Sequence, residues 1–219
     1  DIAKVVIDAV IATEDTAFYE HHGINFKAIL RAVYKDVKAR AFVEGGSTLT
    51  QQLARNIFLT KRRTITRKVE EAILAFNIDR YYSKQEILEL YLNQVYWGHN
   101  AYGIQSAAHM YFAKNAKDLK LGEAALLIGM LTGPELYSPF KNIKGSRRRQ
   151  YIVLNRMAKI GMITQKLADA TYEEELAFAQ KKRHRYKAPF FTSYVVQQLI
   201  DMYGEDATYR SGMKVYTTL

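Results

Sequence analysis

The stretch TITRKVEEAILAFNIDRYYSKQEILELYLNQV, residues 64–95, decides the fold class. Its apolar residues recur at intervals of three and four, which is the period of one face of an α-helix. Ser83 and Glu86 have the spacing of a capping box, in which two side chains bind the free N–H groups at a helix start. We therefore predict one helix over residues 64–82 and a second that continues to about Val95.

Helical periodicity also dominates the rest of the chain. Only 12 glycines and 3 prolines occur, which is few for a loop-rich or all-β chain. The further expected helices cover residues 2–17, 26–42, a segment that begins at Ser47 or Thr48, and residues 104–113, 120–131, 146–163, 165–179 and 190–204. The glycine-punctuated stretch YWGHNAYG, residues 96–103, is expected to be a loop. These patterns predict one all-α domain that ends near residue 180.

Composition narrows the possible partners and excludes some chemistry. The 219 residues include 32 Lys and Arg against 22 Asp and Glu, a formal net charge of +10. This excess indicates an anionic partner, which could be nucleic acid, a phospholipid surface or a phosphorylated substrate. The absence of cysteine excludes disulfides, zinc–thiolate sites and thiol nucleophiles. No apolar run reaches the length of about 18 residues that a membrane-spanning helix needs.

The two ends of the sequence indicate a piece of a longer protein. Asp1 enters directly into a helical pattern, and Gly212–Leu219 reads as a strand that stops without a partner. We expect a domain over residues 1–180. Residues 181–219 are expected to form a basic linker, a helix and the first strand leading toward a further domain. An ordinary ragged end, with no excision from a longer protein, stays open as the alternative.

The first chemistry-bearing stretch is IATEDTAFYEHHG, from Ile11 to Gly23. Glu14 and Asp15 close an apolar run, and Phe18 follows them. A carboxylate with apolar surroundings can act as an acid or base near neutral pH. The alternative is a pair of acids exposed to water at the end of a helix.

The second stretch is EGGSTLTQQLARN, residues 44–56. Two glycines precede a helix start, where free backbone N–H groups favour an anion. Gln51 and Gln52 could donate to phosphate or sugar oxygens. Thr48 with Gln51 also has the spacing of a capping box, and the two interpretations are compatible. No lysine follows the glycines as a nucleotide-binding P-loop requires.

The third stretch is TKRRTITRKVEEA, residues 60–72, in which basic side chains are concentrated. Arg67, Lys68 and Glu71 lie on one side of the expected helix. They could form intrahelical pairs on a solvated face, each worth about 0.3–0.5 kcal/mol. They could instead hold a carboxylate among cations that bind a pyrophosphate. Two distant acids, one in apolar surroundings and one among cations, match the requirements of glycosyl transfer.

These stretches together resemble a known family. EDTAFYEHHG, GGSTLTQQ, RKVEE and LYLNQVYWGHNAYGIQSAAHMYF resemble the four main motifs of the peptidoglycan glycosyltransferases, the transglycosylase half of class A penicillin-binding proteins. SRRRQYIVLNRM resembles a fifth region. The resemblance covers about residues 1–180, and the segment after it is similar to the start of the linker toward a transpeptidase domain, whose serine motif is absent from this chain.

The resemblance implies a role for specific residues. Glu14 matches the family's general base, and Glu71 matches its other catalytic acid. The residues that match substrate-binding positions are Asp15, Phe18 and His21 in the first motif, Ser47, Thr48, Gln51 and Gln52 in the second, and Arg67 and Lys68 in the third. Arg55 and Arg63 fall where the family places phosphate-binding cations. We expect the two acids to face one cleft, with Arg67 and Lys68 directed to its Glu71 end.

The resemblance also implies a fold and an activity. The fold would be a lysozyme-like helical lobe plus a smaller membrane-facing jaw lobe. The activity would be polymerisation of lipid II by inverting transfer, which forms β-1,4 bonds and releases undecaprenyl pyrophosphate. The sequence does not specify a cofactor, and a divalent cation at the pyrophosphate stays open. The site would lie at the extracytoplasmic face of the bacterial inner (plasma) membrane.

The implied partners are lipid II, the lipid-linked glycan chain, an anionic membrane surface and the transpeptidase domain of the same full-length chain, but no nucleic acid. The amphipathic segment 26–42 would suit a lipid-facing surface, with core packing as the alternative. Two rival functions differ in placement of the cations. A lysozyme-like glycan hydrolase has no pyrophosphate for Arg67 and Lys68 to hold. A basic helical nucleic-acid-binding module would carry its cations on one outer face.

Overall fold

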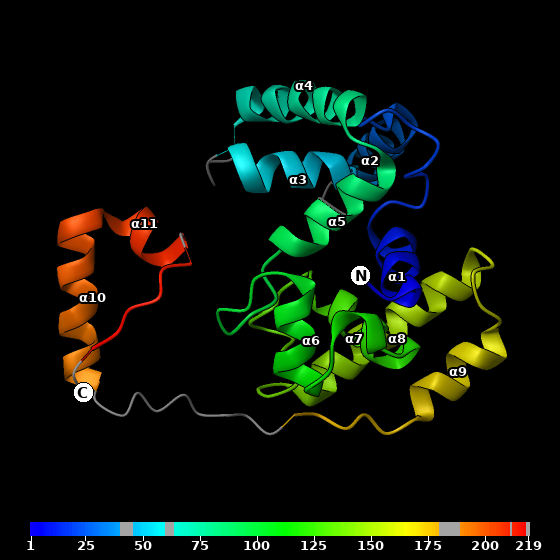
Figure 1. Cartoon of the computed structure of the whole chain (residues 1–219). Coiled ribbons are helices and arrows are strands. Elements are labelled where there is room, and N and C mark those ends of the chain that lie inside the picture. Colours follow the sequence, from blue (N-terminus) through cyan, green and yellow to red (C-terminus); the bar gives the residue numbers. More distant parts are fainter. Residues whose placement is uncertain (40–45, 60–63, 180–188, 211, 218–219) are drawn as a thin grey trace. The chain divides into compact units, whose positions relative to one another are not determined.

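The computed structural model describes residues 1–39, 46–59, 64–179, 189–210 and 212–217. The chain divides into two units, Asp1–Ala179 and Gln180–Leu219, which are described separately. Every regular element in these ranges is a helix, apart from an isolated antiparallel bridge between Tyr96 and Tyr102 (Figure 1). The all-α fold predicted from the sequence is confirmed.

The first unit holds most of the helices. They are α1 (Lys4–Glu14), α2 (Phe26–Ala39), α3 (Leu49–Phe58), α4 (Ile65–Tyr81), α5 (Lys84–Gln94), α6 (Ile104–Phe112), the short 3₁₀ helix η1 (Ala116–Asp118), α7 (Leu121–Met130), α8 (Ile143–Lys159) and α9 (Gln165–Glu173). The second unit contains α10 (Pro189–Tyr203) and α11 (Glu205–Arg210).

Helix α7 forms the centre of the first unit. Every residue from Gly122 to Met130 is buried, as its lack of a polar face predicts. It packs against α1 and α8, and α8 in turn packs against α9. The largest fully buried side chains of the same core are Trp97, Tyr91 and Tyr111. The core therefore fixes α1, which carries the first acidic motif at its end.

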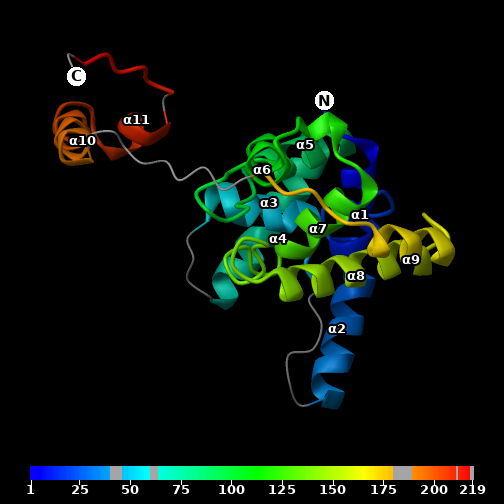
Figure 2. The same ribbon diagram turned by 90° about the horizontal axis from the view of Figure 1, so that it is seen from below.

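A second group of helices is organised around α3. This helix packs against both α4 and α5, between which it lies in Figure 1. Thr48 caps α3 through the predicted capping box with Gln51, and Ser83 caps α5 through the one with Glu86. Figure 2 shows α2 extending away from the other helices of the unit.

Some boundaries differ from the sequence-based expectations. Helix α1 ends at Glu14 rather than at residue 17, because the Asp15 carboxylate accepts from the Leu49 N–H and the chain turns at Asp15. Helix α9 ends at Glu173, and the chain after it reaches α6, where the Ala179 N–H donates to the Tyr111 carbonyl at 2.8 Å. Residues 212–217 form no strand, because no other strand lies beside them in the described ranges. None of the described helices is long and apolar enough to cross a membrane.

Candidate functional site

Glu14 is the last residue of α1, and its side chain is hydrogen-bonded to α3. Its carboxylate is half-buried, and Gln52 on α3 donates from Nε2 to Oε2 at 3.0 Å. The Tyr91 hydroxyl on α5 donates to Gln52 Oε1 at 3.2 Å. The end of α1 is also tied to α8, because Arg156 Nη1 donates to the Thr13 carbonyl at 2.7 Å. A half-buried carboxylate held in this way can accept a proton from a bound hydroxyl group.

The electrostatics of Tyr91 reflect its place beside Glu14. Burial raises the pKa of the Tyr91 hydroxyl far above its usual range, and the negative charge of Glu14 raises it further. The guanidinium of Arg55, a half-buried side chain on α3, acts in the opposite direction. Tyr91 therefore keeps its proton and remains a hydrogen-bond donor at any physiological pH.

Asp15, Phe18 and His21 anchor the loop that follows α1. The Asp15 carboxylate is buried and accepts from the Leu49 N–H at 3.0 Å and from His21 Nε2 at 2.9 Å. Phe18 is fully buried, and Lys84 Nζ lies 4.8 Å from its ring centroid. This geometry favours a role in fastening α1 to the start of α3 over direct substrate contact.

Thr48 and Gln51 are likewise occupied within the protein. Both are buried, and each accepts a hydrogen bond from the other's backbone N–H group. The Thr48 hydroxyl also donates to the Gly23 carbonyl at 2.6 Å. Of the second-motif residues predicted to bind substrate, only Ser47 and Gln52 retain partly exposed side chains.

Glu71 forms the second charged centre, on α4. Its side chain is 0% exposed, and one carboxylate oxygen is bound by Arg67 while the other accepts from Lys68 Nζ at 2.7 Å. The Lys68 ammonium also donates to Ser47 Oγ at 2.7 Å, and its side chain is 45% exposed. Arg67 Nε is buried and has no hydrogen-bond partner among the described residues. The cluster carries a net charge of +1 and presents Lys68 to solvent, which suits an anionic ligand.

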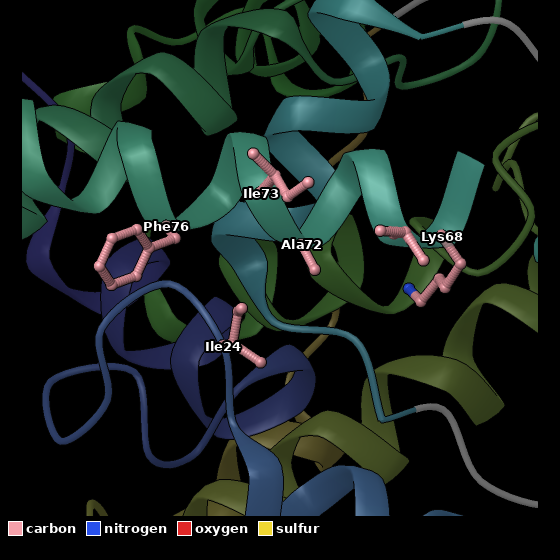
Figure 3. Close-up of a pocket in the computed structure, with 6 residues that line it drawn as sticks. Ile24, Lys68, Ala72, Ile73 and Phe76 are labelled. Atoms are coloured by element: carbon pink, nitrogen blue, oxygen red, sulfur yellow. The ribbon is translucent and has the colours of Figure 1, made fainter. Parts of the chain in front are cut away.

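An open apolar groove of about 470 Å³ begins at this cluster. It is lined by Ile24, Lys68, Val69, Ala72, Ile73 and Phe76. Figure 3 shows Ile24 across from the face of α4 that carries Ala72 and Phe76, with Lys68 at one end. A cation at the end of an apolar groove suits a ligand with an anionic head and an apolar chain.

Helix α3 and the residue just before it contact both charged centres predicted from the sequence. Gln52 binds Glu14, and Ser47, just before the same helix, binds Lys68 of the Glu71 cluster. Arg67 and Lys68 both bind the Glu71 carboxylate. Arg63 lies outside the described residues.

The sequence reasoning assigned no role to Tyr91, Lys84 or Arg156. Tyr91 and Arg156 fall inside quoted motifs, but a motif does not say which partner a side chain meets. Lys84 donates to the His21 carbonyl at 2.6 Å and pairs with Asp79, and thereby holds the first-motif loop against α4 and α5. Only its position at the start of a helix was visible in the sequence.

The described residues do not form a ready site for a divalent cation. They contain no group of three or more His, Cys, Asp or Glu side chains placed to hold a metal ion. Both oxygens of Glu71 are already engaged by cations.

The chain is similar in sequence to one known protein family and to several penicillin-binding proteins. The family model described as "Transglycosylase" matches residues 1–158. Penicillin-binding protein 1A of Neisseria flavescens is 44% identical over 220 residues, which is 100% of this chain and 27% of that protein. Penicillin-binding protein 1F of Bacillus subtilis is 47% identical over 195 residues, covering 89% of this chain and 27% of that protein.

A solved structure is also similar. The crystal structure of penicillin-binding protein 1A from Haemophilus influenzae aligns with a TM-score of 0.51 and 27% identity. The alignment covers 74% of this chain and 20% of that one. The chain therefore spans about a quarter of the length of the relatives it matches.

Proposed function

Because the chain belongs to the transglycosylase family, we propose that it is a peptidoglycan glycosyltransferase that polymerises lipid II into glycan strands. The observation that carries this proposal is the pair of charged centres. Glu14 stands half-buried with one amide donor, and Glu71 stands fully buried between two cations. An acceptor hydroxyl and a departing pyrophosphate require these two kinds of surroundings.

The proposed reaction is a single displacement at the anomeric carbon of the donor. Glu14 takes the proton from the 4-hydroxyl group of the lipid II acceptor as that oxygen attacks. The new C–O bond forms as the bond from carbon to the pyrophosphate oxygen breaks, so the configuration inverts and a β-1,4 linkage results. The electron pair leaves with the undecaprenyl pyrophosphate, and the proton remains on Glu14 until solvent removes it.

In this mechanism Glu71 acts through its cations. Both of its oxygens accept from Arg67 and Lys68, and its side chain is inaccessible to solvent. It therefore orients the two cations toward the leaving group and does not exchange a proton with substrate. Lys68 is the more exposed cation and is the one we assign to direct contact with the pyrophosphate.

The rival functions account for less of this geometry. A glycan hydrolase would need no cations at Glu71, since its substrate has no pyrophosphate. A nucleic-acid-binding module would carry its cations unpaired on one outer face, whereas Arg67 is largely buried and both Arg67 and Lys68 pair with a buried carboxylate. The charge of +10 then serves an anionic lipid or membrane surface.

The proposed function also includes contact with a membrane. Large apolar side chains are exposed on α2, at Phe26, Leu30 and Tyr34, and along α4 at Ile73 and Phe76. We assign these helices to the membrane-facing jaw lobe, at the extracytoplasmic face of a bacterial plasma membrane. The domain would cover residues 1–180, with residues 181–219 leading to the transpeptidase domain of the full-length protein.

A polymerisation assay with lipid II tests the central claim. The chain is expected to form glycan polymer, and Glu14→Gln is expected to reduce the rate by about 10²–10⁴ while the protein stays folded. Release of shorter glycans from preformed strands without polymer formation would instead favour the hydrolase. Near-normal turnover by the Glu14→Gln variant would remove Glu14 from the role of base.

Vesicle sedimentation tests the membrane partner separately. Anionic vesicles of phosphatidylglycerol should bind the chain at low salt and release it as salt rises, because exposed charges are screened over about 8–10 Å at physiological ionic strength. Replacing Phe26 and Leu30 by Ser should weaken binding. Leu167→Ser, which removes an exposed leucine from α9, is the matched control. Equal binding by both variants would contradict the assignment of α2.

A further inference from the structure

Tyr91 is a buried side chain that no step of the proposed reaction uses. It lies on α5, where it is 1% exposed, so its hydroxyl cannot touch a bound substrate. Its hydroxyl donates to Gln52 Oε1 at 3.2 Å, and Gln52 Nε2 in turn donates to Glu14 Oε2 at 3.0 Å. The three side chains form a line from the interior of the unit to the proton-accepting carboxylate.

The chemistry of the three groups allows one arrangement of this line. An ionised carboxylate only accepts hydrogen bonds, so Gln52 must turn its NH₂ group toward Glu14. The Gln52 carbonyl oxygen then faces inward and needs a donor. Tyr91 is such a donor, because burial and the charge of Glu14 keep its hydroxyl protonated. A flipped Gln52 would set oxygen against carboxylate and cost the pair its attraction.

We propose that Tyr91 is a positioning residue for Glu14, acting through Gln52, whose amide it holds with the NH₂ group toward the carboxylate. The inference rests on the proposed function, since it takes Glu14 as the base. It also gives Gln52 a defined task that differs from the substrate contact implied by the family resemblance.

The other charged and polar groups around Glu14 do not duplicate this task. Arg55 on α3 acts on Tyr91 electrostatically, and Arg156 on α8 binds the Thr13 carbonyl rather than the Glu14 side chain. Asp15 is turned to Leu49 and His21. Gln52, in contrast, donates directly to the Glu14 carboxylate.

The test compares Tyr91→Phe with Tyr111→Phe in the same chain. Tyr111 is a matched control, because it is also buried and its hydroxyl also donates one hydrogen bond, to the Trp97 carbonyl at 2.8 Å. Both changes remove one buried hydroxyl and should lower the melting temperature similarly. Only Tyr91→Phe should lower kcat, by about tenfold, with KM unchanged within about twofold.

The split between kcat and KM is a readout that a purely structural role would not produce. A misoriented Gln52 amide disturbs Glu14 in the reacting complex and leaves lipid II binding intact, so Tyr91→Phe should lower kcat alone. Equal kcat values for Tyr91→Phe and Tyr111→Phe would overturn the inference.

A double-mutant cycle with Gln52→Met tests whether the effect passes through Gln52. If it does, Tyr91→Phe should change kcat by less than about twofold in the Gln52→Met background. Fully additive effects would overturn the inference while leaving Glu14 as the base. A wild-type chain that forms no polymer would overturn the proposed function, and this inference with it, so the two failures are distinguishable.

Discussion

Gly23→Ala should displace the loop between α1 and α2, because the backbone of α4 leaves no room for a methyl group at this position. Gly23 has φ +76°, and a Cβ built there would lie 2.3 Å from the Ala75 carbonyl oxygen and 2.7 Å from its carbon. These atoms belong to the backbone of α4 and cannot rotate away. The Gly23 carbonyl also accepts from the Thr48 hydroxyl, so a shift of the loop disturbs the cap of α3.

The loss of folding stability in Gly23→Ala has two separable contributions. A side chain in the left-handed region costs about 1–2 kcal/mol. Overpacking against a fixed backbone adds about 1–3 kcal/mol, and the short contact argues for the upper end. Gly161→Ala is the matched control, because Gly161 has the same φ of +76° but nothing within 4 Å of an added Cβ. The control should show the first cost alone.

Thermal unfolding measures the difference between the two variants. A difference of about 3 kcal/mol corresponds to about 6–12 °C in melting temperature for a domain of this size. Gly23→Ala should also lose polymerisation activity, whereas Gly161→Ala should retain it. Equal melting temperatures would refute the argument that α4 blocks the Cβ at Gly23.

Three further changes test other parts of the molecule. Glu71→Gln should reduce kcat/KM for lipid II about 10²-fold, because Gln cannot hold both cations, and near-normal polymerisation would contradict this. Arg156→Met should lower kcat about tenfold or more by freeing the end of α1, whereas Lys159→Met on the same helix should not. Lys141, Tyr96 and the His99 N–H hold the pKa of Glu135 at about 2, so the stability it contributes is present above about pH 4.5 and is lost as pH falls toward 2. Glu135→Gln should therefore flatten the acid-unfolding curve in that window, and an unchanged curve would rule this out.

The fold class was predictable because helical signals are local. The capping boxes at Thr48 and Ser83 involve residues three apart, and their geometry depends little on the rest of the chain. The α7 segment lacks a polar face, which is enough to predict burial. The end of α1 was not predictable, because it depends on a bond between Asp15 and Leu49, 34 residues away.

The candidate site divides in the same way. The spacing of Arg67, Lys68 and Glu71 indicated a common helix face, and the structure joins them there. The link from Tyr91 through Gln52 to Glu14 crosses three helices, and no local pattern encodes it. The sequence also did not show that Asp15 and Phe18 are buried, because their burial depends on α3 and Lys84, which are distant from them along the chain.

Helix α3 sets the spacing between the two charged centres of the site. Its start, through Ser47, meets Lys68, and its second turn, through Gln52, meets Glu14. Ser47 and Thr48 precede the helix, and from Leu49 to Gln52 the spacing is set by the rise of an α-helix, about 1.5 Å per residue. A substitution of Ser47 or Gln52 can alter what these residues bind but leaves this spacing unchanged. An insertion or deletion of one residue between Leu49 and Gln52 would change the spacing and would rotate Gln52 by about 100° around the helix axis, away from Glu14.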